Sequence, residues 1–231
     1  MPPIHMMLKP VSGQCNLRCS YCFYVDEMNK RRQNSFGRMT AETLENVVKK
    51  ALACADGSCT IAFQGGEPTL AGLDFYRRCV ALQQHYNTRG ITVYNALQTN
   101  GILLDEEWCA FLARHHFLVG LSVDGIQTTH DAFRKGAEGK GTWLSALEAA
   151  RRLGEAGAAF NVLTVVNQRT APRIQKIYTQ YAKLGFSWQQ YILCLDPLGE
   201  KPGQAPWSLT PEAYGRFLIG LFEMWDADLR C

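Results

Sequence analysis

Six apolar segments of strand length alternate along this chain with segments of helical periodicity, and this alternation limits the choice of fold more than any other feature. Several of the apolar runs are continuous, which is typical of strands buried on both faces of a parallel sheet. Strands are expected over residues 6–9, 59–64, 92–97, 118–123, 160–166 and 188–193, and helices over residues 41–54, 74–86, 106–115, 143–156, 172–183 and 211–226. Successive βα units predict an α/β fold with right-handed crossovers. An open doubly wound sheet and a barrel both satisfy the pattern, and both bind ligands at the C-terminal ends of their strands.

Capping residues mark the starts of three of the expected helices. Thr40, Asp105 and Thr210 each stand directly before a helical segment, and Pro211 follows the last of them. A side-chain oxygen at this position accepts a hydrogen bond from a free backbone N–H of the first turn, and proline at the first helical position loses no needed donor. The segment 196–207 contains three prolines and two glycines and is expected to be a loop.

Composition and charge favour one large domain with no nucleic-acid or membrane partner. The 231 residues are 47% hydrophobic, which is enough for a substantial core. The net charge is +3, and Lys and Arg gather only in short pairs such as Arg31-Arg32. No secretion signal is recognised at the N-terminus, and the longest apolar stretch is far shorter than the roughly 20 residues that span a bilayer. A cytoplasmic location is therefore expected.

The cysteines are the strongest functional signal. Nine are present, and three of them form a C-x3-C-x2-C motif at Cys15, Cys19 and Cys22, on the loop after the first strand. An odd number without a secretion signal argues against a disulfide framework. Thiolates hold iron–sulfur clusters, and three of them on one loop leave the fourth iron of a 4Fe-4S cluster open for substrate chemistry. A zinc site with a distant fourth ligand, or cysteines without any ligand, are the alternatives.

Two further strand ends carry candidate ligand-binding residues. Gln64-Gly65-Gly66-Glu67-Pro68 follows the second strand, and glycines there allow close backbone approach to a ligand. Ser122 ends the fourth strand, and Arg134 follows shortly after it. Arg can pair bidentately with a carboxylate. An ordinary turn, a locally bonded serine and a solvated surface arginine are the respective alternatives.

Two other strand ends are less specific, and four cysteines have a simple structural interpretation. The residues 98–101, Gln-Thr-Asn-Gly, suit the floor or rim of a pocket or a plain turn. Leu195 follows the last strand and is either a ligand contact or a core residue. Cys54, Cys59, Cys79 and Cys109 fall on helix or strand patterns and are interpreted as small buried apolar residues.

The C-x3-C-x2-C motif with the aromatic Tyr21 before its last cysteine resembles the signature of the radical S-adenosylmethionine (SAM) superfamily. The resemblance implies a partial (β/α)6 TIM-like barrel of parallel strands with outer helices, covering residues 1–231 as one core domain. It also implies a 4Fe-4S cluster on Cys15, Cys19 and Cys22, whose open iron chelates SAM. The contacts to SAM that it implies are Tyr21, Gly65, Gly66, Glu67, Ser122, Arg134 and Leu195.

Longer strings resemble the anaerobic sulfatase-maturating enzymes in particular. They are Cys-Phe-Tyr at 22–24, the segment 62–72 around Gln64, Leu-Gln-Thr-Asn-Gly at 97–101 and Cys-Leu-Asp-Pro-Leu at 194–198. That family oxidises a Cys or Ser of a sulfatase to formylglycine. The resemblance therefore implies a sulfatase peptide as substrate and a reduced flavodoxin or ferredoxin-type electron donor. Tyr24, Gln64 and Gln98 are the residues expected to contact the peptide.

The resemblance has one departure. The family continues past the barrel into a region that binds two auxiliary 4Fe-4S clusters and supplies the Asp thought to act as base, so no catalytic base is assignable within these 231 residues. The chain is accordingly expected to be a fragment. A different peptide-modifying radical SAM enzyme, such as a thioether-forming one, and a truncated SAM-binding barrel without maturase activity are the alternatives.

Overall fold

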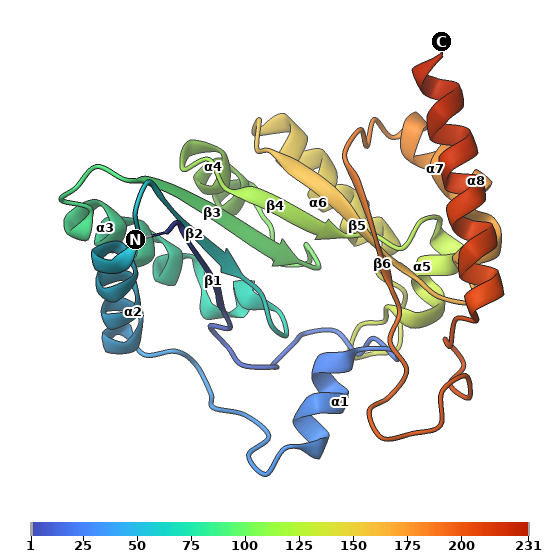
Figure 1. Cartoon of the computed structure of the whole chain (residues 1–231), viewed down its shortest axis with the longest axis horizontal. Coiled ribbons are helices and arrows are strands. Elements are labelled where there is room, and N and C mark those ends of the chain that lie inside the picture. Colours follow the sequence, from blue (N-terminus) through green and yellow to red (C-terminus); the bar gives the residue numbers. More distant parts are fainter. Residues whose placement is uncertain (1, 231) are drawn as a thin grey trace.

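Six parallel strands form a single sheet whose spatial order is the order of the chain (Figure 1). The structure is a computed structural model, and it describes residues 2–230. The strands are β1 (Ile4–Leu8), β2 (Ser58–Phe63), β3 (Thr92–Thr99), β4 (Leu118–Ser122), β5 (Phe160–Val166) and β6 (Gln189–Leu193). Right-handed crossovers between neighbours taken in chain order place every helix on the same side of the sheet, whereas a doubly wound sheet reverses its order. The strand order therefore decides between the two alternatives, and the sheet curls into a half-barrel.

Helices surround the convex side of this half-barrel, and two short ones lie near the ends of its strands (Figure 1). The helices are α1 (Phe23–Lys30), α2 (Ala41–Cys54), α3 (Leu73–Tyr86), α4 (Glu106–Arg114), α5 (Gln127–Phe133), α6 (Trp143–Glu155), α7 (Ile174–Lys183) and α8 (Pro211–Leu229). Two short 3₁₀ helices, η1 (Pro68–Ala71) and η2 (Ala171–Arg173), precede α3 and α7. No helix within residues 2–230 has both the length and the apolar character needed to cross a bilayer.

The main core lies between the convex face of the sheet and the helices. Alternate residues of β2 point outward, so Cys59, Ile61 and Phe63 are fully buried. The ring of Phe63 meets Tyr76 of α3 at 4.9 Å between centroids, and Tyr76 meets Trp108 of α4 at 5.1 Å. Each buried side chain of this size contributes on the order of 2 kcal/mol to folding. The remaining residues of each strand face the concave side, where they are available to a ligand.

The three expected helix caps are confirmed. The side chain of Thr40 accepts a hydrogen bond from the Thr43 N–H at 3.1 Å, and Asp105 accepts one from Trp108 at 2.9 Å. Thr210 accepts one from Ala213 at 3.2 Å. These bonds satisfy first-turn donors that no residue of the helix itself can reach.

The expected strands and helices agree with the structure apart from shifts at their ends and two omissions. The helix expected from residue 172 begins as a 3₁₀ turn and becomes α-helical only at Ile174. The helices α1 and α5 were not expected, because segments of eight and seven residues show little periodicity. The interpretation of Cys54 as buried is wrong, since it lies exposed on the last turn of α2, whereas Cys59, Cys79 and Cys109 are buried as expected. Cys231 lies outside the described residues.

Candidate active site

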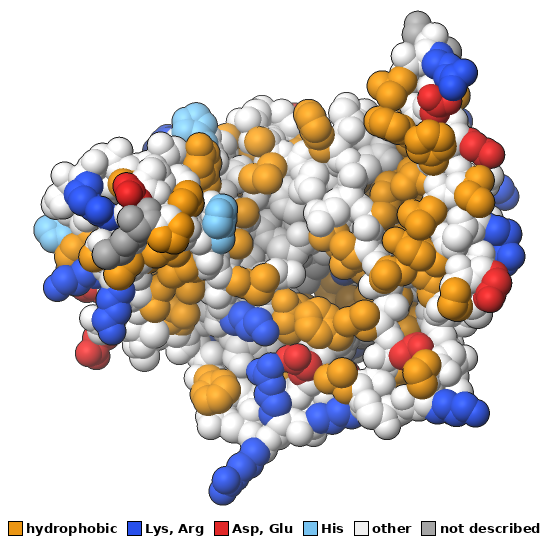
Figure 2. Space-filling view, in the orientation of Figure 1, with side chains coloured by type: hydrophobic (Ala, Val, Ile, Leu, Met, Phe, Trp, Pro, Cys, Tyr) orange, Lys and Arg blue, Asp and Glu red, His pale blue; other side chains and the backbone are white. Residues whose placement is uncertain are grey.

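A pocket of about 210 Å³ opens on the concave side, at the carboxyl ends of the strands. Figure 2 looks onto this side and shows a hollow at its centre with hydrophobic side chains around it. Every residue named from the sequence as a cluster, SAM or peptide ligand lines this one pocket: Cys15, Cys19, Tyr21, Cys22, Tyr24, Gln64, Gly65, Gly66, Glu67, Gln98, Ser122, Arg134 and Leu195. A larger cavity of about 440 Å³ lies between α3 and α4 and contains none of them.

The three cysteines of the motif lie on the loop that joins β1 to α1. Cys22 stands at the N-terminal end of α1, and its backbone N–H donates to the Cys19 carbonyl at 3.1 Å. The Cys15 sulfur accepts from the Leu17 N–H at 3.3 Å. All three thiols are free and half-buried. Burial raises the pKa of Cys19 to about 11, so the Cys19 thiol is protonated at neutral pH unless a bound metal favours the thiolate.

This set of donors fits an iron–sulfur cluster. Three free thiols reach the same pocket from within eight residues of loop, and each would bind a different iron. Within residues 2–230, no three His, Cys, Asp or Glu side chains come together as they would around a single metal ion. A 4Fe-4S cluster does not require such close grouping, because each of its three thiolates binds a different iron atom.

The glycine loop after β2 packs directly against the cysteine loop. The Gly66 N–H donates to the Ser12 carbonyl at 3.1 Å, and the Glu67 N–H donates to Gln14 at 2.7 Å. Gly65 has a φ of 120°, a conformation that other residues rarely adopt. A Cβ on Gly66 would lie 2.0 Å from the Gln14 carbonyl oxygen. The glycines therefore allow this loop to approach the segment that leads into Cys15.

Glu67 ties the ends of β2 and β3 together. Its Oε1 accepts hydrogen bonds from the Thr69 N–H at 3.0 Å, the Thr69 hydroxyl at 2.6 Å and the Thr99 hydroxyl at 2.7 Å. Its Oε2 accepts from the Asn100 N–H at 2.8 Å. The carboxyl group is buried, and burial raises its pKa while these hydrogen bonds oppose the rise. Both oxygens thus already have partners from the protein, and Glu67 shapes the pocket as well as lining it.

The remaining candidates for SAM and peptide contact reach the pocket from several strand ends. Gln98 of β3 lies opposite Gly120 of β4, and its amide donates to the Ser122 hydroxyl at 3.2 Å. The absence of a side chain at Gly120 leaves the room that the Gln98 side chain fills. Tyr24 lies under the Lys9 ammonium, which is 4.8 Å from its ring centre. Leu195 is more than half exposed, so the interpretation of Leu195 as a core residue is wrong.

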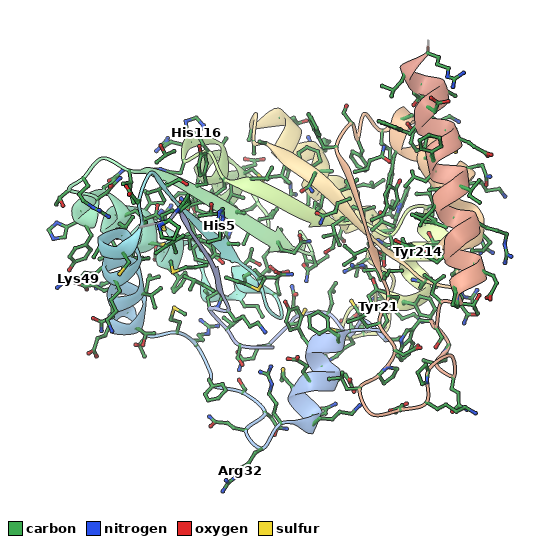
Figure 3. All side chains as sticks on the ribbon, viewed as in Figure 1. His5, Tyr21, Arg32, Lys49, His116 and Tyr214 are labelled. Carbon is green, nitrogen blue, oxygen red and sulfur yellow. The ribbon has the colours of Figure 1, made fainter. Side chains whose placement is uncertain are left out.

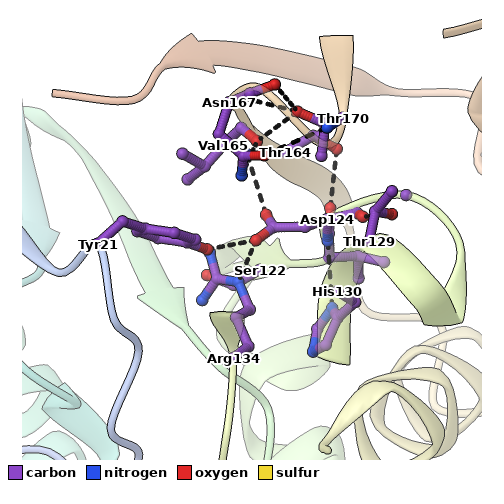
Figure 4. Close-up of polar contacts among 12 residues, drawn as sticks. Tyr21, Ser122, Asp124, Thr129, His130, Arg134, Thr164, Val165, Asn167 and Thr170 are labelled. Carbon is purple, nitrogen blue, oxygen red and sulfur yellow. Dashed lines mark hydrogen bonds and ion pairs between the residues drawn. The ribbon is translucent and has the colours of Figure 1, made fainter. Parts of the chain in front are cut away.

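Arg134 is buried, so its interpretation as a solvated surface residue is wrong. Its Nε lies 2.9 Å from Oδ2 of Asp124, which is completely buried (Figure 4). The same Oδ2 accepts a hydrogen bond from the Tyr21 hydroxyl, and Arg134 lies 5.6 Å over the Tyr21 ring. Figure 3 shows Tyr21 in the region where β6 and α1 approach each other.

Sequence patterns assigned no role to Asp124 or Cys194, and they indicated Asn100 only as part of the segment 98–101. Asn100 and Cys194 line the pocket, and the Asn100 amide lies 3.7 Å from the Cys15 sulfur. Asn100 belongs to the segment 98–101 that suits a pocket floor, and three of its residues do line the pocket. The available signal for Asp124 was a lone carboxylate directly after a strand.

Comparisons with known proteins agree with this geometry. The family model of the radical SAM superfamily matches residues 10–179. The cysteine-type anaerobic sulfatase-maturating enzyme of Clostridium perfringens is 45% identical over 228 residues, which are 99% of this chain and 62% of that enzyme. The serine-type enzyme of Klebsiella aerogenes is 32% identical over 96% of this chain and 54% of its own length.

A solved structure described as native anSMEcpe with bound AdoMet and Kp18Cys peptide superposes with a TM-score of 0.94 at 43% identity. It covers 99% of this chain, and the chain covers 61% of it. The chain thus spans about three fifths of the length of these relatives. The family model matches well over half of the chain, and its residues include the three cysteines and the glycine loop. This chain belongs to the radical SAM superfamily.

Proposed function

We propose that this chain is the core of a radical SAM enzyme that oxidises a Cys or Ser of a sulfatase polypeptide to formylglycine. In this proposal residues 1–231 act as one core domain, Cys15, Cys19 and Cys22 hold a 4Fe-4S cluster, and SAM occupies the pocket beside it. The observation that carries the proposal is that three free thiols and a buried arginine line one pocket at the carboxyl ends of the strands.

The chain's own residues would bind and orient SAM. Nε of Arg134 donates a hydrogen bond to Asp124, whereas its terminal amino groups make no hydrogen bond to any residue between 2 and 230. These amino groups therefore suit the carboxylate of SAM. The Gly65-Gly66 backbone and the region of Glu67 suit its amino group. Ser122 suits its ribose or carboxylate, and Leu195 and Tyr21 offer apolar surface to the adenine and the cluster. When bound and reduced, the cluster supplies the electron that cleaves SAM to methionine and a 5′-deoxyadenosyl radical.

Tyr24, Gln64 and Gln98 also line the pocket, and they are the residues proposed to contact the peptide. The proposed reaction removes one hydrogen atom from Cβ of the target residue. Loss of a proton, and of one electron to a one-electron acceptor, then gives a thioaldehyde or an aldehyde. Water converts the thioaldehyde to formylglycine and releases sulfide. Support comes from the likeness to maturating enzymes over 99% of this chain, and the higher identity to the cysteine-type relatives makes a Cys peptide the first substrate to test.

The test is an anaerobic assay of the reconstituted chain. The protein is loaded with iron and sulfide, reduced with dithionite or with a flavodoxin, and mixed with SAM and a sulfatase peptide that carries Cys or Ser. Formation of 5′-deoxyadenosine is measured by chromatography, and the exchange of the Cys thiol for a carbonyl oxygen is measured by mass spectrometry. We expect both products, with the Cys peptide as the better substrate.

The two products separate the two parts of the proposal. Cleavage of SAM with no change in either peptide would support the cofactor assignment and overturn the substrate assignment. Protein that takes up zinc in place of iron, or a cluster that never cleaves SAM, would overturn both parts.

A further inference from the structure

We propose that Asp124 is a positioning residue that fixes Arg134 and Tyr21 in the geometry in which the pocket receives the carboxylate of SAM. This inference rests on the proposed function, because it concerns how the same pocket holds SAM. Asp124 does not line the pocket, so it acts through residues that do.

The carboxylate of Asp124 is fully withdrawn from solvent and accepts hydrogen bonds at both oxygens (Figure 4). Oδ2 accepts from Nε of Arg134 at 2.9 Å and from the Tyr21 hydroxyl. Oδ1 accepts from the Val165 N–H at 3.0 Å. Hydrogen bonds to ionised groups are the stronger ones, and a buried carboxylate without partners would be costly.

These three donors come from three separate parts of the half-barrel. Tyr21 belongs to the cysteine loop, Arg134 follows α5, and Val165 lies in β5, while Asp124 itself follows the end of β4. The side chain of Asp124 therefore connects the cysteine loop to the residue after α5 and to β5. Tyr21 lies between Cys19 and Cys22 in the chain, so its anchor also limits where these two thiols can lie.

A second chain of hydrogen bonds fixes the backbone on either side of the ion pair. The Asp124 N–H donates to Nδ1 of His130 at 3.2 Å, and Nε2 of His130 lies 3.1 Å from the Thr142 hydroxyl. That hydroxyl donates to the Arg134 carbonyl at 3.3 Å. Because Nδ1 accepts, Nε2 carries the proton, and His130 is a neutral link from the backbone of Asp124 to the backbone of Arg134.

The geometry shows how Asp124 prepares the arginine for a ligand. A guanidinium has donors in a fixed, planar fork, so engaging Nε sets the direction in which the terminal amino groups point. Without the carboxylate, the buried positive charge of Arg134 would lose its counter-ion and its orientation. Asp124 thus gives the arginine a counter-ion, holds it in place and leaves its terminal amino groups free.

The test compares the isosteric variant Asp124→Asn with the control Asp131→Asn. Asp131 caps the start of α6 through bonds to Thr142 and Trp143 and touches neither Arg134 nor Tyr21 through its side chain. SAM is titrated into the reduced, reconstituted proteins, and the change that it causes in the electron paramagnetic resonance spectrum of the cluster is followed per loaded cluster. We expect D124N to raise the half-saturating SAM concentration by about 10–100-fold, and D131N to change it by no more than about twofold.

A double variant separates positioning from general destabilisation. If Asp124 acts through Arg134, then D124N added to Arg134→Gln should weaken SAM binding by no more than about twofold beyond R134Q alone. If D124N does not fold, Thr142→Val leaves the carboxylate in place and removes the hydroxyl that bonds to His130 and to the Arg134 carbonyl. It should weaken SAM binding in the same direction, to a smaller extent.

The outcomes distinguish this inference from the proposed function. A wild-type spectrum that ignores SAM would overturn both. A wild-type spectrum that responds to SAM, with an unchanged SAM requirement in D124N, would overturn the role of Asp124 alone. If D124N does not fold, an unchanged requirement in T142V has the same meaning. The role of Asp124 would also be overturned if the double variant D124N/R134Q showed the product of the two single-variant losses in SAM binding.

Discussion

The α-carbon of Gly66 stands so close to Gln14 that an added Cβ would lie 2.0 Å from the Gln14 carbonyl oxygen. The obstacle is backbone rather than the end of a flexible side chain, so it cannot turn aside. Replacing Gly66 by Ala must push the glycine loop away from the segment that leads into Cys15. This contact links the shape of the glycine loop, proposed to face SAM, to the placement of the proposed cluster ligands.

The first prediction follows from that contact. Gly66→Ala should lower the free energy of unfolding by about 1–3 kcal/mol through overpacking, and it should reduce the iron bound after reconstitution. Gly154→Ala is the matched control, because Gly154 lies in α6 with open space around its α-carbon. It should stabilise the protein by about 0.5–1 kcal/mol. Urea unfolding and iron analysis measure both effects, and a G66A protein with wild-type iron content would contradict the expectation.

The second prediction concerns the hydrogen bonds that Glu67 accepts. Glu67→Gln keeps the shape of the side chain but places an amide N–H₂ against one of its present donors. The variant should lose about 1–3 kcal/mol of stability at neutral pH, because a buried donor is left without an acceptor. The exposed Glu138, whose one ion-pair partner within residues 2–230 is Lys140, provides the control E138Q. This variant should stay within about 0.5 kcal/mol of wild type. Equal unfolding midpoints for the two variants would refute a structural role for Glu67.

The third prediction is a pH dependence that originates at His130. Burial lowers the pKa of His130 to about 4 from its ordinary 6.5, the nearby Arg134 also lowers it, and Asp124 and Asp131 oppose the shift. The unfolded chain therefore binds a proton between pH 6.5 and pH 4 that the folded protein does not bind. Stability is fully present above pH 6.5 and falls as the pH drops to 4, by about 3 kcal/mol in total.

His130→Asn tests this origin, because the Asn oxygen can replace Nδ1 as the acceptor for the Asp124 N–H but does not titrate. The free energy of unfolding should fall less steeply for H130N than for wild type between pH 6.5 and pH 5. Between pH 7 and pH 8 the two slopes should agree, since His130 is neutral there in both states. Parallel curves over the whole range would rule out His130 as the source.

The fourth prediction concerns the cluster ligands. Cys19→Ala should abolish the visible absorption of the reconstituted cluster, because a cubane held by only two thiolates loses a protein ligand from a second iron. Cys54→Ala is the control, since this thiol is exposed on α2 and lies far along the chain from the motif. It should leave the iron and sulfide content of the protein unchanged. Full cluster content in C19A would show that the motif is not the ligand set.

Local sequence alone determined the order of the secondary structure elements. Apolar runs of strand length and helical periodicity depend on residues a few positions apart, and so do the caps at Thr40, Asp105 and Thr210. The motif at Cys15, Cys19 and Cys22 is equally local, because its spacing sets its chemistry. The short helices α1 and α5 escaped prediction, since a helix of fewer than about 12 residues has little stability of its own and forms where tertiary packing supports it.

Only the tertiary structure decided which side chains of the site are buried and which hydrogen bonds they form. No local pattern tells whether Arg134 is solvated or buried, because its burial depends on Asp124 and on the Tyr21 hydroxyl, which lies 103 residues from that carboxylate. The four hydrogen bonds to Glu67 likewise include two from the end of β3. Parallel strands bring their carboxyl ends to one edge regardless of their distance along the chain. The sequence therefore determined which residues reach that edge, and the curl of the sheet decided which of them touch.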